Sequence, residues 1–268
     1  MRTFPVSLFV FCLVLTAFAV NQFAQSNGSS AAAPPFVVGE TLTYEGKINK
    51  IIRGIGVADL TFTVGKAPES ENYLVKSSAR SKGTLLKLFR FSFLQEIDST
   101  IGIRDFHILK TVKHDVQKER VRNSEAVFDY GEKRVTYVET DPKEPMRPPR
   151  TIASKIDNRT HDLVSGIYSL RMLPLAVGKK FEIMISDSGL VYNIPVKVTA
   201  REKQKSILGN VWCHRVEIDI FGPGRLIEKE GSMIIWMTDD VRRLPVRSQV
   251  NAPIGRVEIK LKTAKNLR

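Results

Sequence analysis

The sequence predicts an all-β protein of mainly antiparallel strands, arranged as a strongly curved sheet or an incomplete β-barrel with one short helix packed at its mouth. Apolar and polar residues alternate with a period of two in successive segments from Thr41 onward, which is typical of half-buried strands. The links between these segments are short, as antiparallel pairing requires. One segment, Thr160 to Pro174, has helical spacing instead, and an isolated apolar helix face is most readily buried against a sheet.

The alternation is clearest in the first two predicted strands. Leu42, Tyr44 and Ile48 share one face of the first, and the apolar residues from Ala58 to Val64 share one face of the second. Further strands are predicted within 73–82, 85–97, 101–122, 127–135, 181–186, 192–198, 212–220, 233–238, 244–250 and 257–261. A sheet of about a dozen strands rarely stays flat, so it is expected to curl or to close.

Large aromatic residues are predicted to face the interior of this sheet. Phe89, Phe91 and Phe93 recur every second residue in the predicted strand 85–97, and Trp212 and Trp236 lie on strands farther along the chain. Each ring contributes about 1.5–3 kcal/mol if it is fully buried. With Tyr168 of the helix, these residues form either plain core or the lining of an apolar cavity for a ligand.

The helix is expected to span 162–173, with Asp162 or Thr160 as its N-cap and Pro174 at its end. Asp162, Ser165, Tyr168 and Arg171 follow one another at intervals of three and make a polar stripe. A second polar group, Asp239, Asp240, Arg242 and Arg243, marks an acidic turn that returns through arginines. Paired carboxylates and arginines predict a structural clasp between helix and sheet formed by Asp162, Ser165, Arg171, Asp239, Asp240 and Arg243, with a ligand site as the alternative.

The first residues have the pattern of a cleavable signal peptide. Met1 and Arg2 precede an uncharged run that ends in Ala17-Phe18-Ala19, which favours export and cleavage after residue 19 over a membrane anchor. Cleavage would leave no transmembrane span and would lower the net charge from +13 to +12. We therefore expect a signal peptide at 1–19, a disordered linker at 20–35 and one β domain at 36–265, with the proline-rich segment 139–150 as a candidate internal boundary.

Motifs for catalysis and for metal or cofactor binding are not apparent. The four histidines are dispersed, no Gly-rich phosphate loop occurs, and Cys213 is the single cysteine left after cleavage. No catalytic residue, cofactor or metal ligand is therefore predicted. A hydrolase that assembles Ser165, His161 and Asp162 or Asp239 in three dimensions stays as a minor alternative.

Three motifs stand out: Asp162…Ser165…Tyr168…Arg171…Pro174-Leu175…Gly178, then Trp236…Asp240…Arg243-Leu244-Pro245-Val246, and Val38-Gly39-Glu40…Leu42…Tyr44 near the start. Together they resemble the motifs of domain-of-unknown-function family 3108. The resemblance spans roughly Phe36 to Leu261. It implies an exported bacterial protein with a signal peptide and a mostly β body, and it brings no established activity or catalytic residue.

These observations favour an exported, non-enzymatic module that binds or carries a lipid-like or amphipathic ligand in the periplasm or outside the cell. Its excess of Lys and Arg fits an anionic envelope component better than nucleic acid in an exported protein. The alternatives are a structural or protein-interaction module of the envelope and, less favoured, a hydrolase. A sheet filled by its own side chains would favour the interaction module.

Overall fold

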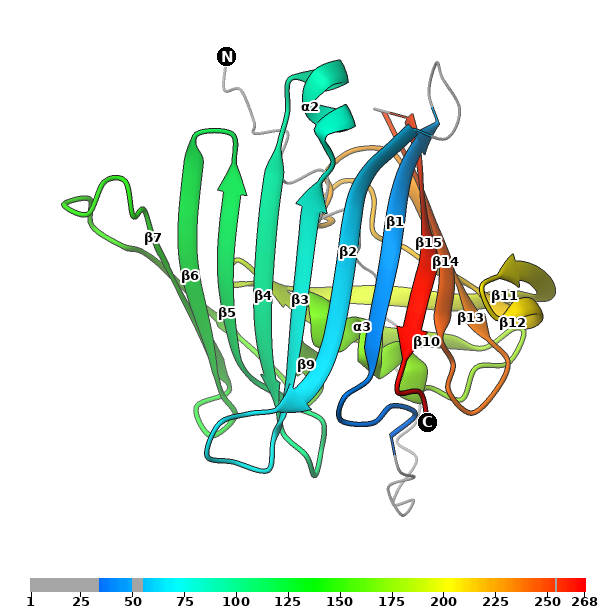
Figure 1. The fold of residues 1–268 in the computed structure, drawn as a ribbon. Helices are drawn as coiled ribbons and strands as arrows, with labels where there is room; N and C mark the ends of the chain where they lie inside the picture. Colours follow the sequence, from blue (N-terminus) through cyan, green and yellow to red (C-terminus); the bar gives the residue numbers. More distant parts are fainter. Residues whose placement is uncertain (1–33, 50–54, 254) are drawn as a thin grey trace.

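A computed structural model describes residues 34–49, 55–253 and 255–268, without the side chains of Leu86, Leu88 and Phe89. The described residues form one sheet of fifteen strands in the order β8-β7-β6-β5-β4-β3-β2-β1-β15-β14-β13-β12-β11-β10-β9 (Figure 1). Every neighbouring pair is antiparallel except β9 and β10. The predicted fold class, a curved and mainly antiparallel sheet with a helix packed against it, is confirmed.

The strands fall into two runs that meet where β1 pairs with β15. The first run is β1 (Thr41–Asn49), β2 (Ile55–Lys66), β3 (Tyr73–Ser81), β4 (Phe93–Ile101), β5 (Ile108–Gln117), β6 (Arg120–Asp129), β7 (Arg134–Thr140) and β8 (Arg150–Lys155). The second is β9 (Thr160–His161), β10 (Lys180–Asp187), β11 (Leu190–Ser206), β12 (Gly209–Ile218), β13 (Ser232–Thr238), β14 (Pro245–Ala252) and β15 (Gly255–Lys265). The proline-rich segment 139–150 thus joins two adjacent strands, β7 and β8, of the same sheet.

The sheet curls until its two ends touch without closing. The β10–β11 turn reaches β7 and β8, where a Cβ atom placed on Gly189 would lie 2.7 Å from the Cβ of Tyr137 and 2.8 Å from that of Ile152. Gly189 also has a φ of +82°, a conformation that L residues rarely adopt. A side chain at position 189 would therefore separate the two ends of the sheet.

Helix α3 (Leu163–Met172) lies inside the curve of the sheet, behind β1–β4 in Figure 1. Asp162 is its N-cap and Leu173, before Pro174, is its C-cap in extended conformation, as the sequence predicted. Eight of its ten residues are buried, including Ser165, Gly166 and Ser169. The helix is therefore enclosed on nearly every side and fills the interior more deeply than a lid over an opening would.

The prediction of one continuous strand across 85–97 is wrong. A second helix, α2 (Gly83–Phe89), precedes β4, which begins only at Phe93. Leucine is not branched at Cβ and therefore supports a helix as well as a strand. Arg90, with a φ of +49°, follows the helix in the left-handed conformation. Phe91 and Phe93 still pack together, with ring centroids 6.2 Å apart, whereas the predicted contact of the Phe89 side chain lies outside the described part of the chain.

Trp212 is on the same side of β12 as Val216 and Ile218 in the strand register, but it is not buried with them as the sequence predicted. Trp212 is 44% exposed, whereas the next residue, Cys213, is fully buried. The pairing of β12 with β13 starts only at Cys213, so residues 209–212 continue past β13 in a two-stranded hairpin with β11. Alternation along a strand cannot show where the neighbouring strand ends, and that end decides which face is covered.

The N-terminal predictions lie mostly outside the described residues, since the signal peptide 1–19 and most of the linker 20–35 are not described. Pro34 and Pro35, at the end of the predicted linker, are held by the body of the protein. Their carbonyl oxygens accept hydrogen bonds from Arg268 and Arg171, each at 2.8 Å.

Candidate functional site

The first turn of α3 is anchored by Asp162, whose two carboxylate oxygens have different partners. Oδ1 accepts hydrogen bonds from the backbone N–H and the hydroxyl of Ser165, each at 2.7 Å, while Ser165 Oγ accepts from the Asp162 N–H at 3.0 Å. Oδ2 accepts from Ser99 of β4 and, at 2.8 Å, from Thr111 of β5. This capping box therefore ties the start of the helix to the sheet and uses both oxygens of the carboxylate.

The last turn of α3 holds a fully buried ion pair. Arg171 Nη1 and Nη2 donate to the two carboxylate oxygens of Glu40 at 2.5 and 2.9 Å. Nη2 also donates to the Pro35 carbonyl, and the guanidinium lies 5.5 Å from the Phe36 ring centroid and 5.3 Å from that of Tyr168. Bidentate pairing of this kind is the strong form of an Arg–carboxylate contact, and it fixes α3 to the segment that leads into β1.

Sequence reasoning placed Arg171 in the clasp but named no partner for it, and it missed Glu40. Glu40 stands just before β1 within the Val38-Gly39-Glu40 motif, and this was the available signal. An arginine expected on a buried helix requires a buried carboxylate, but no sequence spacing connects positions 131 residues apart.

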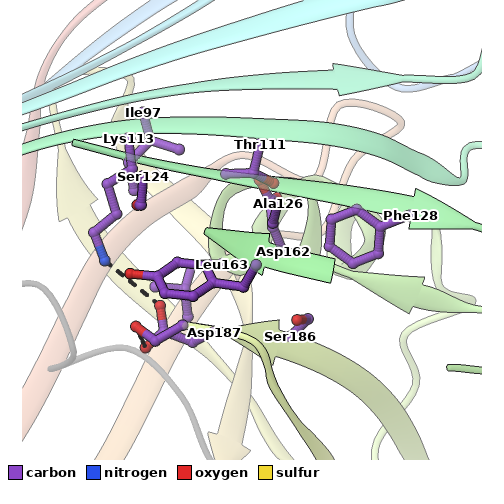
Figure 2. Close-up of a pocket in the computed structure, with 12 residues that line it drawn as sticks. Ile97, Thr111, Lys113, Ser124, Ala126, Phe128, Asp162, Leu163, Ser186 and Asp187 are labelled. Atoms are coloured by element: carbon purple, nitrogen blue, oxygen red, sulfur yellow. Dashed lines mark hydrogen bonds and ion pairs between the residues drawn. The ribbon is translucent and has the colours of Figure 1, made fainter. Parts of the chain in front are cut away.

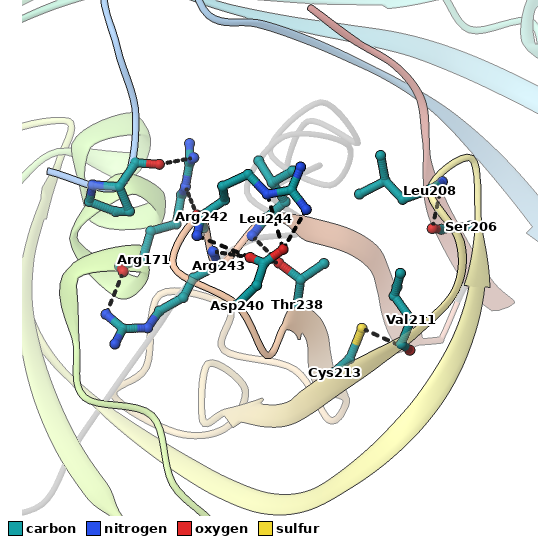
Figure 3. Close-up of polar contacts among 11 residues, drawn as sticks. Arg171, Ser206, Leu208, Val211, Cys213, Thr238, Asp240, Arg242, Arg243 and Leu244 are labelled. Carbon is teal, nitrogen blue, oxygen red and sulfur yellow. Dashed lines mark hydrogen bonds and ion pairs between the residues drawn. The ribbon is translucent and has the colours of Figure 1, made fainter. Parts of the chain in front are cut away.

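The turn between β13 and β14 holds the same end of α3 through backbone carbonyls (Figure 3). Arg171 Nε donates to the Arg242 carbonyl at 3.1 Å, and Arg243 Nη1 donates to the Arg171 carbonyl at 3.0 Å. Asp240 shapes the turn by accepting from the N–H groups of Arg242 and Arg243 at 3.0 and 3.1 Å and from Thr238 Oγ1 at 2.8 Å. The helix and the turn therefore hold each other by two reciprocal bonds.

The structure brings five of the six predicted clasp residues to α3 or its contacts, Asp162 and Ser165 at one end and Arg171, Asp240 and Arg243 at the other. Asp239 lies apart. Its carboxylate contacts Arg201 Nε at 2.5 Å and His214 Nδ1 at 3.6 Å, so it belongs to the β11–β12 hairpin.

Two small apolar cavities lie against the sheet, the first beside α3 and the second beside Leu85 of α2. One, of about 50 Å³, is lined by residues that include Tyr44, Phe62 and Tyr168. The other, of about 40 Å³, is lined by residues that include Leu85 and Phe93. Leu60 and Ile259 line both cavities, so they form the partition between them.

Of the six predicted ligand-binding residues, Tyr168 and Phe93 line these cavities, but they line different ones. Phe91, Trp212 and Trp236 line neither cavity, and the side chain of Phe89 is outside the described part of the chain. Trp236 is opposite Arg215 and Arg247 in the strand register and therefore lies on the other face of β13 from Ile235. There its indole N–H donates to Glu202, and the Arg247 guanidinium lies 4.4 Å from its ring.

A third cavity lies at the first turn of α3, where β5 and β6 approach the end of β10 (Figure 2). It has a volume of about 30 Å³, which is room for about one water molecule. Its polar wall includes Thr111, Asp162 and Asp187, and Lys113 Nζ contacts Asp187 Oδ1 at 3.5 Å. At this cavity the first run of strands contacts the second through the polar pair of Lys113 in β5 and Asp187 in β10.

A wider hollow lies on the outward face of the sheet. It has a volume of about 460 Å³ and crosses β2 to β5. Its side chains form two rows in register, Thr63, Lys76, Asp98 and Val112 in one and Thr61, Ser78, Glu96 and His114 in the other. The outer surface therefore offers more open space than the interior does.

Burial shifts the pKa values of three titratable groups toward their neutral forms. Burial lowers the pKa of His161 to about 4 and raises the pKa of the Cys213 thiol to about 12. Burial also raises the pKa of Tyr44. Such groups are poorly suited to act as nucleophiles or cations at neutral pH.

The hydrolase arrangement lacks an open cleft. Ser165 is fully buried, and its hydroxyl is bonded to Asp162 within the capping box. Within the described part of the chain, no cluster of three or more His, Cys, Asp or Glu residues could hold a metal ion. No helix of that same part is long and apolar enough to cross a membrane.

Comparisons with known proteins agree with this architecture. The family model "Protein of unknown function (DUF3108)" matches residues 41–262. The crystal structure of a beta-barrel-like protein of domain of unknown function DUF1849 from Brucella abortus is similar, with a TM-score of 0.60 and 10% identity over 88% of this chain and 100% of that chain. No curated protein matches the sequence. The family match covers most of the chain and confirms the resemblance seen in its motifs, and the protein therefore belongs to the DUF3108 family of proteins of unknown function.

Proposed function

We propose that this protein is a non-enzymatic binding module of the cell envelope that works through its outer surface, with the sheet and the enclosed helix serving as a rigid scaffold. The filled interior is the observation that carries this proposal. The three internal cavities have volumes of about 30, 50 and 40 Å³, whereas pockets for drug-sized ligands have roughly 300–1,000 Å³.

The polar contacts of α3 support a scaffold that does not open easily. Withdrawal of the helix would break the bonds of Asp162 to Ser99 and Thr111 and expose or unpair the buried charges of Arg171 and Glu40. Leaving one such charge buried without its partner costs about 3–5 kcal/mol. Enclosure of a whole lipid beneath the helix would therefore oppose several buried interactions at once.

Native mass spectrometry with lipid extraction tests the proposal on protein purified from its own envelope. A surface-binding module should give the polypeptide mass alone or complexes of polypeptides, with no stoichiometric lipid after denaturation. Recovery of one lipid per chain would overturn the proposal and favour a carrier.

The carrier of one slender apolar chain is the second candidate, because the two apolar cavities are separated by the side chains of Leu60 and Ile259. In a carrier, Leu60→Ala should join the cavities and increase the uptake of a fluorescent fatty acid. Thr61→Ala, which changes the adjacent outward residue of β2, is the matched control. Equal uptake by the two variants would count against the carrier.

A further inference from the structure

The β11–β12 hairpin has one face packed on the protein and one face open to solvent. On the packed face, Glu202 accepts the indole N–H of Trp236, and Gln204 Oε1 accepts from Arg247 Nη1 at 3.1 Å. The residues between and beside them, Arg201, Lys203 and Lys205, are exposed. Side chains of a strand alternate between its faces, so these three basic residues share the open face.

Apolar side chains complete the open face. Trp212 is directly opposite Lys203 in the register and is 44% exposed. The Arg201 guanidinium lies 4.4 Å, and the Lys203 ammonium 5.3 Å, from its ring centroid. Ile207, in the turn at the tip, is 47% exposed. The hairpin thus combines an aromatic ring, an aliphatic tip and three positive charges.

We propose that this open face, Arg201, Lys203, Lys205, Ile207 and Trp212, docks on an anionic lipid bilayer. Trp is favoured at the boundary between head groups and acyl chains, because its ring is apolar and its N–H is polar. Basic residues near an anionic surface each strengthen binding by about fivefold. Ile207 at the tip would enter the apolar layer while the basic side chains remain among the head groups.

The chemistry of the face favours a bilayer over nucleic acid. Arg201 already lies against the Trp212 ring, so that ring face is not free to stack on a base, which is the usual role of an exposed aromatic residue in single-strand binding. The exposed side chain of Ile207 at the tip would gain no apolar contact from a phosphate backbone, whereas it could be buried among acyl chains. Asp239 is paired with Arg201, so the net positive charge of the face comes from Lys203 and Lys205.

Vesicle binding tests the inference with the whole mature protein. Sedimentation with vesicles of phosphatidylcholine and phosphatidylglycerol should show binding that is weak with phosphatidylcholine alone and falls at high salt. Reversal of two charges in Lys203→Glu/Lys205→Glu should weaken binding by about 25-fold or more. The matched control is Lys180→Glu/Lys197→Glu, because these lysines are also exposed and face each other in the β10–β11 pair.

Tryptophan fluorescence reports which face is in contact. Trp236 is 5% exposed, so a blue shift and quenching by brominated lipid should come from Trp212 and disappear in Trp212→Ala. Trp236→Phe, which keeps Trp212 as its tryptophan, should retain the blue shift. Circular dichroism of wild type and both variants checks that the substitutions leave the fold intact.

Three results would overturn the inference. The first is that both double-lysine variants lose vesicle binding equally, and the second is that the protein does not bind anionic vesicles. The third is that single-stranded DNA or polyglutamate competes with the vesicles while the tryptophan emission shows no blue shift. The inference rests on the proposed surface-binding role, but the two fail separately. Vesicle binding by this face would stand even if a lipid were extracted from the interior. A lipid-free protein that ignores vesicles would leave the scaffold proposal intact and remove this one.

Discussion

Arg171 is completely buried on the last turn of α3, and its charge is balanced by Glu40 from a distant part of the chain. A buried ion pair is weak evidence for net stabilisation, because desolvation of both charges offsets their attraction. Removal of one partner is a different matter, since the other charge then remains in an apolar site. The pair therefore acts mainly as a device that allows one position of the helix.

Glu40→Gln should lower the free energy of unfolding by about 3–5 kcal/mol, because Arg171 keeps its charge and loses its counterion. The double variant Glu40→Leu/Arg171→Met, which removes both charges, should be more stable than Glu40→Gln. Urea denaturation followed by tryptophan fluorescence measures both. A single variant as stable as wild type would show that the pair is not buried in solution.

His161 gives the stability a pH dependence. Burial keeps its folded pKa near 4 against an ordinary value of 6.5, so the unfolded chain binds the additional proton in that interval. Stability should therefore fall as the pH drops from 6.5 to 4, by up to roughly 3 kcal/mol. In His161→Phe this part of the slope should vanish, whereas the difference between variant and wild type should stay constant above pH 7. An unchanged acid slope in urea titrations would contradict the burial of a neutral imidazole.

Helix α3 approaches β10 closely at Gly166, where a larger residue would press on the side chain of Ile185. A Cβ atom at Gly166 would lie 2.5 Å from Ile185 Cδ1, and such overpacking costs about 1–3 kcal/mol. The close approach is also the reason why α3 is buried on nearly every side.

Gly166→Ala should accordingly destabilise the protein by about 1–3 kcal/mol. Ile185→Val removes the clashing Cδ1 atom, so the double variant Gly166→Ala/Ile185→Val should be more stable than the sum of the two single effects predicts. Thermal or urea unfolding of the four proteins completes the double-mutant cycle. Strict additivity would show that the helix does not press on Ile185.

The whole sheet depends on a contact between its two ends, where the β10–β11 turn meets β7 and β8 at Gly189. Fifteen strands in one twisted sheet would otherwise leave a wide opening. The sheet curls around α3 until its ends meet, and the three internal cavities described above have volumes of only about 30 to 50 Å³.

Gly189→Ala should weaken this contact, because the added Cβ would clash with Tyr137 and Ile152 and the φ of +82° disfavours alanine. We expect a loss of about 1–3 kcal/mol and faster amide hydrogen exchange in β7, β8 and β10. Gly209→Ala is a matched control, since Gly209 also has positive φ, +89°, but nothing lies within 4 Å of its Cβ position. Equal effects of the two variants would mean that backbone conformation alone, and not the meeting of the ends, determines the loss.

Local patterns predicted most of the strands and the helix cap, but they did not predict the long-range pairing of Glu40 with Arg171. Leu42, Tyr44 and Ile48 are buried as their alternation indicates, and Asp162 caps α3 as its side-chain chemistry requires. The strand predicted through Phe89 became a helix because a run of leucines fits both elements. Trp212 was misplaced because the end of β13 determines its exposure, and β13 is remote from it in sequence.

The sequence by itself determined the class of fold, because side-chain periodicity is a local property and decides which residues each strand can bury. It also determined where α3 begins and ends, through the N-cap of Asp162 and through Pro174. Only the tertiary structure decided that Glu40 balances Arg171, that the interior is filled and that Trp212 stands among basic residues at the surface. These facts depend on which segments come into contact after the sheet has curled. The free energy of such contacts is determined by packing and desolvation, which are properties of the three-dimensional structure.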